Sequence, residues 1–169
     1  MITVLSIGEG DYRVRLNMCL TARAFGAAKI VFIGRRDGRI SKYISGLNSK
    51  WGGMFKVDFS GNAASTLRSF SKYKKIYLTM FGTPLKQVAY TLKTYNNILL
   101  IVTARDWEGQ LAKLTDFNVS ITNQPHAQVA SIAIFLHEFF NGRELAIQFQ
   151  NAKYKVIPKP KGAQIRKLG

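Results

Sequence analysis

The chain has 169 residues, with 25 Lys and Arg against 9 Asp and Glu, which gives a formal net charge of +16. Its 47% hydrophobic and 12% aromatic content excludes disorder as the source of this charge, because disordered chains combine high charge with few apolar residues. A chain of this length buries about 70% of its unfolded surface and most often forms one domain. The sequence therefore predicts one folded domain. We place this domain over residues 1–158 and expect a basic tail over residues 159–169.

The basic excess is not spread evenly along the sequence. Residues 1–60, residues 61–100 and residues 151–169 each carry a net charge of +6, whereas residues 101–150 carry −2. Lys and Arg side chains that neutralise phosphates release condensed counterions, so a polyanion is the natural partner of such a chain. A membrane surface is a weaker candidate, because the sequence contains neither a basic amphipathic helix nor a lipidation signal.

Cysteine and histidine usage points to a reducing cytoplasm and to no metal. Cys19 is the single cysteine and has no partner in the chain for a disulfide. His126 and His137 are eleven residues apart, with no cysteine or carboxylate at the spacing of a metal site. The longest strongly apolar run, residues 98–102, is far shorter than the roughly 20 residues that span a bilayer.

Short apolar runs rich in β-branched residues alternate with helical patterns along the whole chain. Repeated strand–helix units need crossover helices, so this alternation predicts an α/β fold with a parallel sheet covered on both faces. The tail from Asn151 is expected to be part strand and part loose basic arm. We expect strands at Thr3–Ile7, Ile30–Ile33, Phe55–Phe59, Ile76–Met80, Ile98–Thr103 and Val119–Thr122, and helices near residues 13–25, 39–50, 63–72, 84–95, 107–115 and 127–140.

Three loops leave the carboxyl ends of expected strands, which is where parallel sheets bind ligands. They are Leu78–Gly82, Thr103–Glu108 and Thr122–His126. If they converge, their backbone groups could read the edge of an adenine ring. Taken alone, Thr122–His126 is also the pattern of an ordinary capped turn before a helix, which is the commoner structure. A dinucleotide-binding turn after the first strand is disfavoured, because the third glycine of that pattern would fall at Arg13.

Four segments carry a family resemblance. Residues 20–27 read Leu-Thr-Ala-Arg-Ala-Phe-Gly-Ala, residues 51–53 Trp-Gly-Gly, residues 78–82 Leu-Thr-Met-Phe-Gly, and residues 123–126 Asn-Gln-Pro-His. In this order and spacing the chain resembles the archaeal tRNA (cytidine-56-2′-O)-methyltransferases of the SPOUT, or trefoil-knot, class. The resemblance runs from about residue 2 to Pro158, and its most specific part is Asn-Gln-Pro-His followed by an apolar helix.

The resemblance implies a fold, a partner and a cofactor. The fold would be a parallel-sheet α/β-knot with a C-terminal trefoil knot, in an obligate homodimer. The helix over residues 127–140 would lie at the dimer interface; the alternative is that it belongs only to the core, and a helix with so wide an apolar face can do both. The activity would be 2′-O-methylation of the T-loop cytidine at position 56 of tRNA with S-adenosylmethionine. The resemblance places the cofactor at Leu78, Thr103, Ala104, Arg105, Asp106, Trp107, Ile121, Thr122, Asn123, Gln124, Pro125, His126, Ala127 and Gln128.

The resemblance also points to two arginines as catalytic candidates, Arg23 and Arg13, which lie in the segment that resembles the first motif of the family. A ribose 2′-hydroxyl is a weak nucleophile and needs in-line alignment with the methyl group. Arginine is a poor base, since its pKa exceeds about 12, so we interpret its role as a clamp on a substrate phosphate that positions the hydroxyl. General phosphate contact, or a charge on a helix surface, is the alternative.

The sequence departs from the usual residues of the family at positions that touch both the cofactor loops and the catalytic end. Two alternatives therefore stand beside the methyltransferase hypothesis. One is a divergent SPOUT RNA-binding protein with weak or lost methyl transfer, and the other is a methyltransferase for another RNA nucleotide. The departures are at Ser6, Glu9, Asn17, Thr103, Arg105, Asp106 and Thr122.

Overall fold

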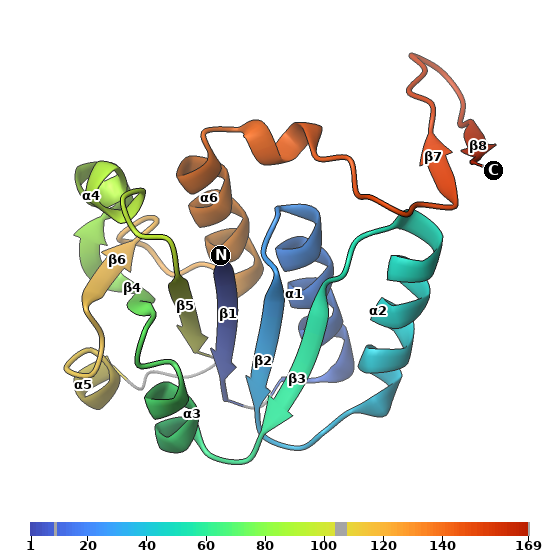
Figure 1. Ribbon diagram of the computed structural model, residues 1–169. Coiled ribbons are helices and arrows are strands. Elements are labelled where there is room, and N and C mark those ends of the chain that lie inside the picture. The colour runs from blue at the N-terminus through green and yellow to red at the C-terminus, as the bar shows by residue number, and fades with distance from the viewer. Residues whose placement is uncertain (9, 104–107, 169) are drawn as a thin grey trace.

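A computed structural model describes residues 1–8, 10–103 and 108–168, with the backbone alone at Glu108. Strands and helices alternate through most of the chain, and a short hairpin ends it (Figure 1). In chain order the elements are β1 (Ile2–Ile7), α1 (Tyr12–Ala24), β2 (Lys29–Ile33), α2 (Gly38–Trp51), β3 (Lys56–Ser60), α3 (Ala63–Ser69), β4 (Lys74–Pro84), α4 (Leu85–Leu92), β5 (Ile98–Thr103), α5 (Glu108–Leu111), β6 (Phe117–Ser120), α6 (Gln128–Phe140), the 3₁₀ helix η1 (Arg143–Ala146), β7 (Tyr154–Val156) and β8 (Ile165–Lys167).

The first six strands form one parallel sheet in the order β3-β2-β1-β5-β4-β6, as the alternation of strands and helices predicts. Alternate residues of each strand face opposite sides of the sheet. In β5, Ile98, Leu100 and Val102 belong to one core and Leu99 and Ile101 to the other. The protein therefore has three layers, with the sheet between two sets of helices.

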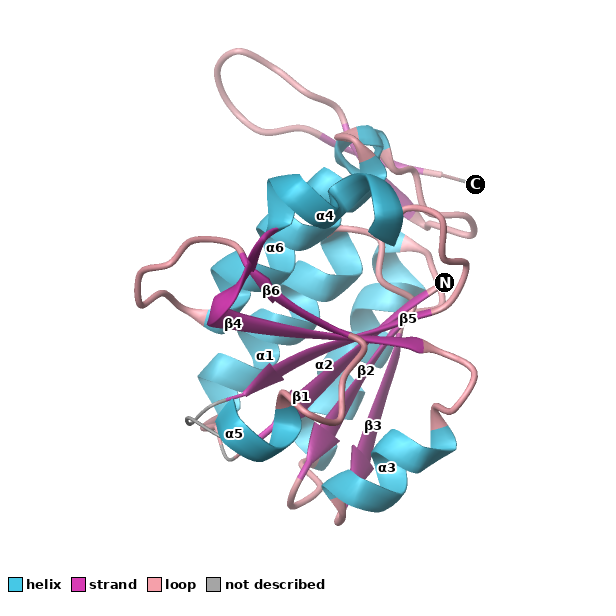
Figure 2. Ribbon diagram, turned by 90° about the vertical axis from the view of Figure 1, so that its left-hand side faces the viewer, coloured by secondary structure: helices cyan, strands magenta, loops and turns pink. Residues whose placement is uncertain are grey.

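The two sets of helices differ in number. Buried residues of α1, α2, α4 and α6 pack on one face of the sheet, and those of α3 and α5 pack on the other. Figure 2 shows α3 and α5 on one side of the fanned strands. Because every strand runs in the same direction, all six amino ends lie at one edge of the sheet and all six carboxyl ends at the other. We call these the amino edge and the carboxyl edge.

Two elements differ from their expected lengths. β4 continues to Pro84 through the expected loop, because Thr83 and Pro84 pair with Val119 and Ser120 of β6. α5 ends at Leu111 rather than near residue 115, because the Asn118 side chain donates a hydrogen bond to the carbonyl of Ala112 at 3.0 Å and holds the following residues in a turn.

The segment after α6 crosses the amino edge and reaches α2, as Figure 1 shows. The amide of Gly53 donates to the carbonyl of Gln150 at 2.9 Å, and that of Lys153 donates to Lys50 at 3.1 Å. β7 then pairs antiparallel with β8, so the hairpin joins residues on both sides of position 158. No helix in the described part of the chain is long and apolar enough to cross a membrane.

Substituting Leu100, which is fully buried in the middle of β5, tests this core. Leu100→Ala should lower the free energy of unfolding by about 2–5 kcal/mol, since it removes buried surface and leaves a cavity. Leu114→Ala, at a leucine that is 61% exposed, is the matched control and should change the value little. Urea unfolding followed by circular dichroism gives both numbers, and equal losses for the two variants would contradict the described core.

Candidate functional site

Residues 79–82 of β4, Thr103 at the end of β5 and residues 121–128 after β6 lie together at the carboxyl edge of the sheet. The rest of the loop after β5, residues 104–107, lies outside the described residues. Within β4 the register shifts, because Leu78 and Thr83 both pair with Val119 and residues 79–82 leave the ladder between them. A Cβ atom on Gly82 would lie 2.4 Å from the backbone nitrogen of Val119. Only glycine therefore lets this excursion pack directly on β6.

Side chains of the third loop join it to the other two. Asn123 Nδ2 donates to the carbonyl of Met80 at 2.6 Å, and Gln128 Nε2 donates to the carbonyl of Thr103. The hydroxyls of Tyr77 and Thr103 lie 3.2 Å apart, which connects β4 with the end of β5. Polar contacts between residues far apart in sequence thus join residues 123–128 to the β4 excursion and to the end of β5.

The polar residues before α6 do not cap this helix. Its N-cap residue is Ala127, which has no side-chain hydrogen bond to the first turn. Asn123 is instead bonded to Met80, and His126 Nδ1 lies 2.7 Å from the carbonyl oxygen of Gln124. Residues 122–127 are exposed, so their backbone groups and side chains border the surface at the carboxyl edge. The interpretation of this segment as an ordinary capped turn is therefore wrong.

A hollow of about 300 Å³ opens between the β4 excursion and α5, and none of the described residues predicted to hold the cofactor lines it. Phe81, 66% exposed, is the large apolar side chain at its edge. Of the predicted cofactor residues, Leu78 is buried in the core and Ile121 and Gln128 are half-buried at the same edge. The predicted residues Ala104, Arg105, Asp106 and Trp107 lie outside the described residues. The hollow is lined by Tyr77, Thr79, Phe81, Gly109, Ala112 and Asn118.

Arg23 lies at the amino edge, because α1 runs back across the sheet and ends there. Its Nε donates to Asn48 Oδ1 at 3.0 Å, and its Nη2 donates to the carbonyl of Gly52 at 2.6 Å. The guanidinium carbon lies 4.5 Å from the ring centroid of Phe149. The residue is only 8% exposed, and this burial lowers the pKa of its guanidinium. Arg23 is therefore neither a surface charge nor in contact with the three loops of its own chain.

Only glycine fits at position 52, because the backbone of residues 149–152 passes close to it beside Arg23. The φ of Gly52 is +78°, and a Cβ there would lie 2.5 Å from the carbonyl oxygen of Gln150. The Trp-Gly-Gly element thus presents the carbonyl that holds Arg23, while the segment after α6 closes over it. The sequence alone does not identify Asn48 or Phe149 as contacts of Arg23. For Asn48, the one feature that could have indicated this role is a polar residue on the inward side of α2.

Arg13 lies at the opposite end of α1, exposed in its first turn. Ten helical residues at 1.5 Å each separate Arg13 from Arg23, which is about 15 Å. Arg13 therefore borders the carboxyl edge and Arg23 the amino edge. The two predicted catalytic residues do not come together within one chain.

Comparison with known proteins identifies the family. The family described as tRNA ribose 2′-O-methyltransferase, aTrm56, matches residues 51–166. A tRNA (cytidine(56)-2′-O)-methyltransferase of Methanopyrus kandleri is 35% identical over 170 residues, which cover 98% of this chain and 96% of the relative. The chain belongs to the aTrm56 family. An enzyme of the same name from Metallosphaera sedula is 39% identical over 93% of this chain and 91% of its own length.

Solved structures agree with this assignment at the level of the fold. The A. aeolicus TrmH/SpoU tRNA modifying enzyme superposes with a TM-score of 0.62 at 14% identity, covering 85% of this chain and 75% of that one. The SpoU methyltransferase AviRb of Streptomyces viridochromogenes, in complex with AdoMet, gives a TM-score of 0.60 at 14% identity, covering 83% of this chain and 57% of that one. The predicted fold class is thereby confirmed.

The positions that we expect to depart from the family's usual residues differ in how deeply they are buried. Ser6 is buried within β1, whereas Asn17 on α1 and Thr122 after β6 are exposed. Thr103 is half-buried at the end of β5. Glu9, Arg105 and Asp106 lie outside the described residues. Among the residues that are described, no group of three or more His, Cys, Asp or Glu side chains could hold a metal ion.

Asn48 provides a test of how Arg23 is anchored. Asn48→Ala removes the acceptor of Arg23 Nε and also the donor to the carbonyl of Phe55, so the variant should lose about 1–3 kcal/mol of unfolding free energy. Asn17→Ala, on the exposed side of α1, is the control and should be close to neutral. Chemical denaturation measures both variants. An Asn48 variant as stable as the wild type would show that these bonds do not hold Arg23.

Proposed function

We propose that this member of the aTrm56 family transfers the methyl group of S-adenosylmethionine to the ribose 2′-hydroxyl of cytidine 56 in tRNA. The observation that carries the proposal is the match to tRNA (cytidine(56)-2′-O)-methyltransferases over nearly the whole length of both chains. The junction of three loops at the carboxyl edge supports it, because parallel sheets bind ligands at that edge.

The described residues of this junction suit the cofactor. Exposed backbone groups of residues 122–127 can pair with an adenine edge, and the hollow beside Phe81 offers apolar surface for the ring. S-adenosylmethionine, when bound, supplies an electrophilic methyl group on a sulfonium. Asn123 and Gln128 act by holding the three loops in register. We therefore propose that the cofactor lies between residues 78–82, 103–107 and 121–128.

Arg23 would position the substrate. Burial lowers the pKa of its guanidinium, but no described acidic side chain lies close enough to form an ion pair with it. Although it is only 8% exposed, Arg23 lines an open hollow of about 570 Å³ from which a phosphate could reach its guanidinium, and its bonds to Asn48 and Gly52 fix where this charge lies. A clamp of this kind aligns the 2′-hydroxyl for in-line attack without itself removing the proton.

A homodimer would bring the two parts of the site together. Within one chain Arg23 is at the amino edge and the three loops are at the carboxyl edge. A second copy related by a two-fold axis, lying beside the first and running in the opposite direction, would place the carboxyl edge of each subunit next to the amino edge of the other, and so the loops of one beside Arg23 of the other. Two large apolar side chains of α6 and η1 face solvent: Ile134 of α6 is 47% exposed and Leu145 of η1 is 69% exposed. We propose that they lie in the dimer interface and that the dimer acts on tRNA in the cytoplasm.

The activity itself is tested with unmodified tRNA transcript, the protein and S-adenosylmethionine. Nucleoside mass spectrometry should detect 2′-O-methylcytidine, and a transcript with uridine at position 56 should yield none of it. Product with both transcripts would assign the activity to another nucleotide. Tight tRNA binding with no methylated product would instead favour an RNA-binding protein that has lost methyl transfer.

The composite site is tested with mixed dimers. Arg23→Ala removes the clamp, and Gly82→Val forces the β4 excursion away from β6; each variant alone should be inactive. After subunit exchange, half of the dimers are mixed and each has one intact site, so about a quarter of wild-type activity should return. Continued inactivity of well-folded, exchanged subunits would show that Arg23 serves the loops of its own chain or none.

A further inference from the structure

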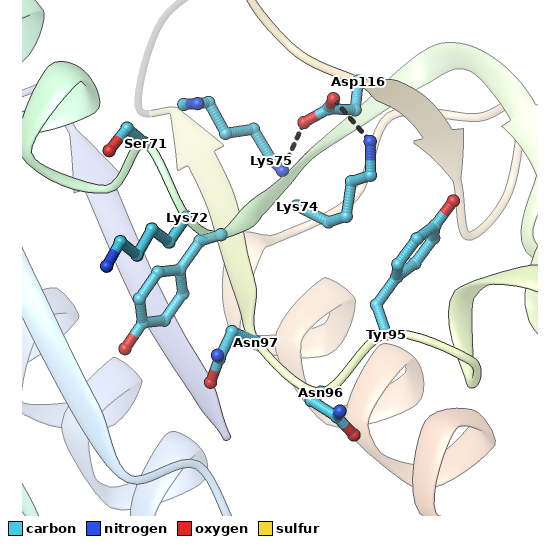
Figure 3. A pocket seen from close by; sticks show the side chains of 9 residues that line it. Ser71, Lys72, Lys74, Lys75, Tyr95, Asn96, Asn97 and Asp116 are labelled. Carbon is cyan, nitrogen blue, oxygen red and sulfur yellow. Dashed lines mark hydrogen bonds and ion pairs between the residues drawn. The ribbon is translucent and has the colours of Figure 1, made fainter.

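A second hollow, of about 310 Å³, opens at the amino edge between β4, β5 and the start of β6. Figure 3 shows polar and basic side chains around it. It lies at the far end of β5 from the three loops, about 17 Å away at 3.3 Å per residue, and is therefore separate from the proposed cofactor site of the same chain. The hollow is lined by Ser71, Lys72, Tyr73, Lys74, Lys75, Tyr95, Asn96, Asn97 and Asp116.

Asp116 organises one wall of this hollow. One of its carboxylate oxygens lies 3.0 Å from Lys74 Nζ, and the other accepts a hydrogen bond from the backbone of Lys75 at 2.8 Å. Lys74 Nζ also lies 5.3 Å from the ring centroid of Tyr95. Figure 3 shows this carboxylate between the two lysines, with Tyr95 beside Lys74. The ion pair raises the pKa of Lys74, so this lysine stays charged well above neutral pH.

Other polar groups at the hollow have no partner within the described part of the chain. The ammonium groups of Lys72 and Lys75 form no hydrogen bond or ion pair there, and neither do the side-chain amides of Asn96 and Asn97. Lys74 and Lys75 lie beside Asp116 and Lys72 lies farther from it, so the hollow has three lysines against one carboxylate and a local excess of positive charge. This excess belongs to residues 61–100, which contain six basic residues and no acidic one.

These groups match the chemistry of one nucleotide. Two free ammonium groups suit a phosphate, and amides next to a tyrosine ring suit the polar edge and the face of a base. The hollow is at the lower end of the size range of small-molecule sites, which suits a single nucleotide rather than a large ligand. A lipid headgroup would require neighbouring aliphatic surface, whereas the hollow is lined by lysine, asparagine, serine, aspartate and two tyrosines.

We propose that this hollow binds a phosphate-bearing nucleotide of the tRNA, separate from the nucleotide that is methylated. The proposal rests on the proposed function, because it takes tRNA to be the polyanion. The hollow lies on the same edge of the sheet as Arg23 and the segment that leads to the β7–β8 hairpin. A strand bound at this edge would therefore anchor the tRNA while its target ribose lies at the catalytic site.

The test compares two double variants with the same change in charge. Lys72→Ala/Lys75→Ala removes the unpaired lysines, and Lys42→Ala/Lys113→Ala removes two exposed lysines elsewhere. The first should raise the dissociation constant for tRNA about tenfold and make the slope of log affinity against log salt shallower by about two. It should raise KM for tRNA but leave kcat at saturating tRNA and the melting temperature unchanged. The control should change each value much less.

Binding is measured without cofactor, so the result does not depend on methyl transfer. If the wild type binds tRNA but yields no methylated product, the proposed function fails while the hollow is still tested. Equal affinities and salt slopes for the two double variants would overturn the proposal. A titration with cytidine monophosphate distinguishes a site for a free nucleotide from a site for RNA. If cytidine monophosphate binds the wild type but not Lys72→Ala/Lys75→Ala, while the tRNA affinity of the two proteins is the same, the proposal is also overturned.

Discussion

All six strands of the sheet run in one direction, and this single constraint places every functional element of the protein. A chain that adds parallel strands must return across the sheet after each one, so each crossover helix has one end at each edge. In α1 this puts Arg13 at the carboxyl edge and Arg23 at the amino edge, about 15 Å apart. Because β5, β4 and β6 are neighbours in the sheet, their carboxyl ends lie together at the carboxyl edge. The two halves of the proposed site are therefore separated by the same geometry that builds the core.

Each edge also depends on a glycine whose missing side chain permits a close backbone contact. Gly82 lets the β4 excursion lie on Val119, and Gly52 lets its carbonyl reach Arg23 while Gln150 passes over it. In both places the local structure is fixed by contacts between segments distant in sequence. The family motifs at residues 51–53 and 78–82 are therefore packing requirements as much as chemical ones, and a methyl group at either glycine would move a functional loop.

The sequence alone predicts those features of the fold that depend on the local pattern of apolar residues. The six strands, the parallel sheet and the contact between the β4 excursion and the segment after β6 all follow from short apolar runs separated by helical periodicity. It does not predict features that depend on contacts with residues far away in the sequence. The burial of Arg23 depends on Asn48, Gly52 and Phe149, which lie 25 or more positions away. The extension of β4 depends on pairing with β6, and the short α5 depends on Asn118, so neither could be read from its own segment.

The charged residues behind the net charge of +16 differ in where they lie on the protein and in whether they form an ion pair. Several acidic residues are already occupied: Asp58 pairs with Lys29, Asp37 with Arg39 and Asp116 with Lys74. These pairs cancel charge within the protein, whereas Lys72, Lys75 and Arg23 have no acidic partner among the described residues. All three lie at the amino edge, away from the loops proposed for the cofactor. In a two-fold dimer of the proposed kind, with the amino edge of each chain beside the carboxyl edge of the other, one subunit would supply the charge that holds the RNA and its partner the methyl group. The proposed transfer site would then need two chains, because Arg23 and the loops lie at opposite edges of one chain.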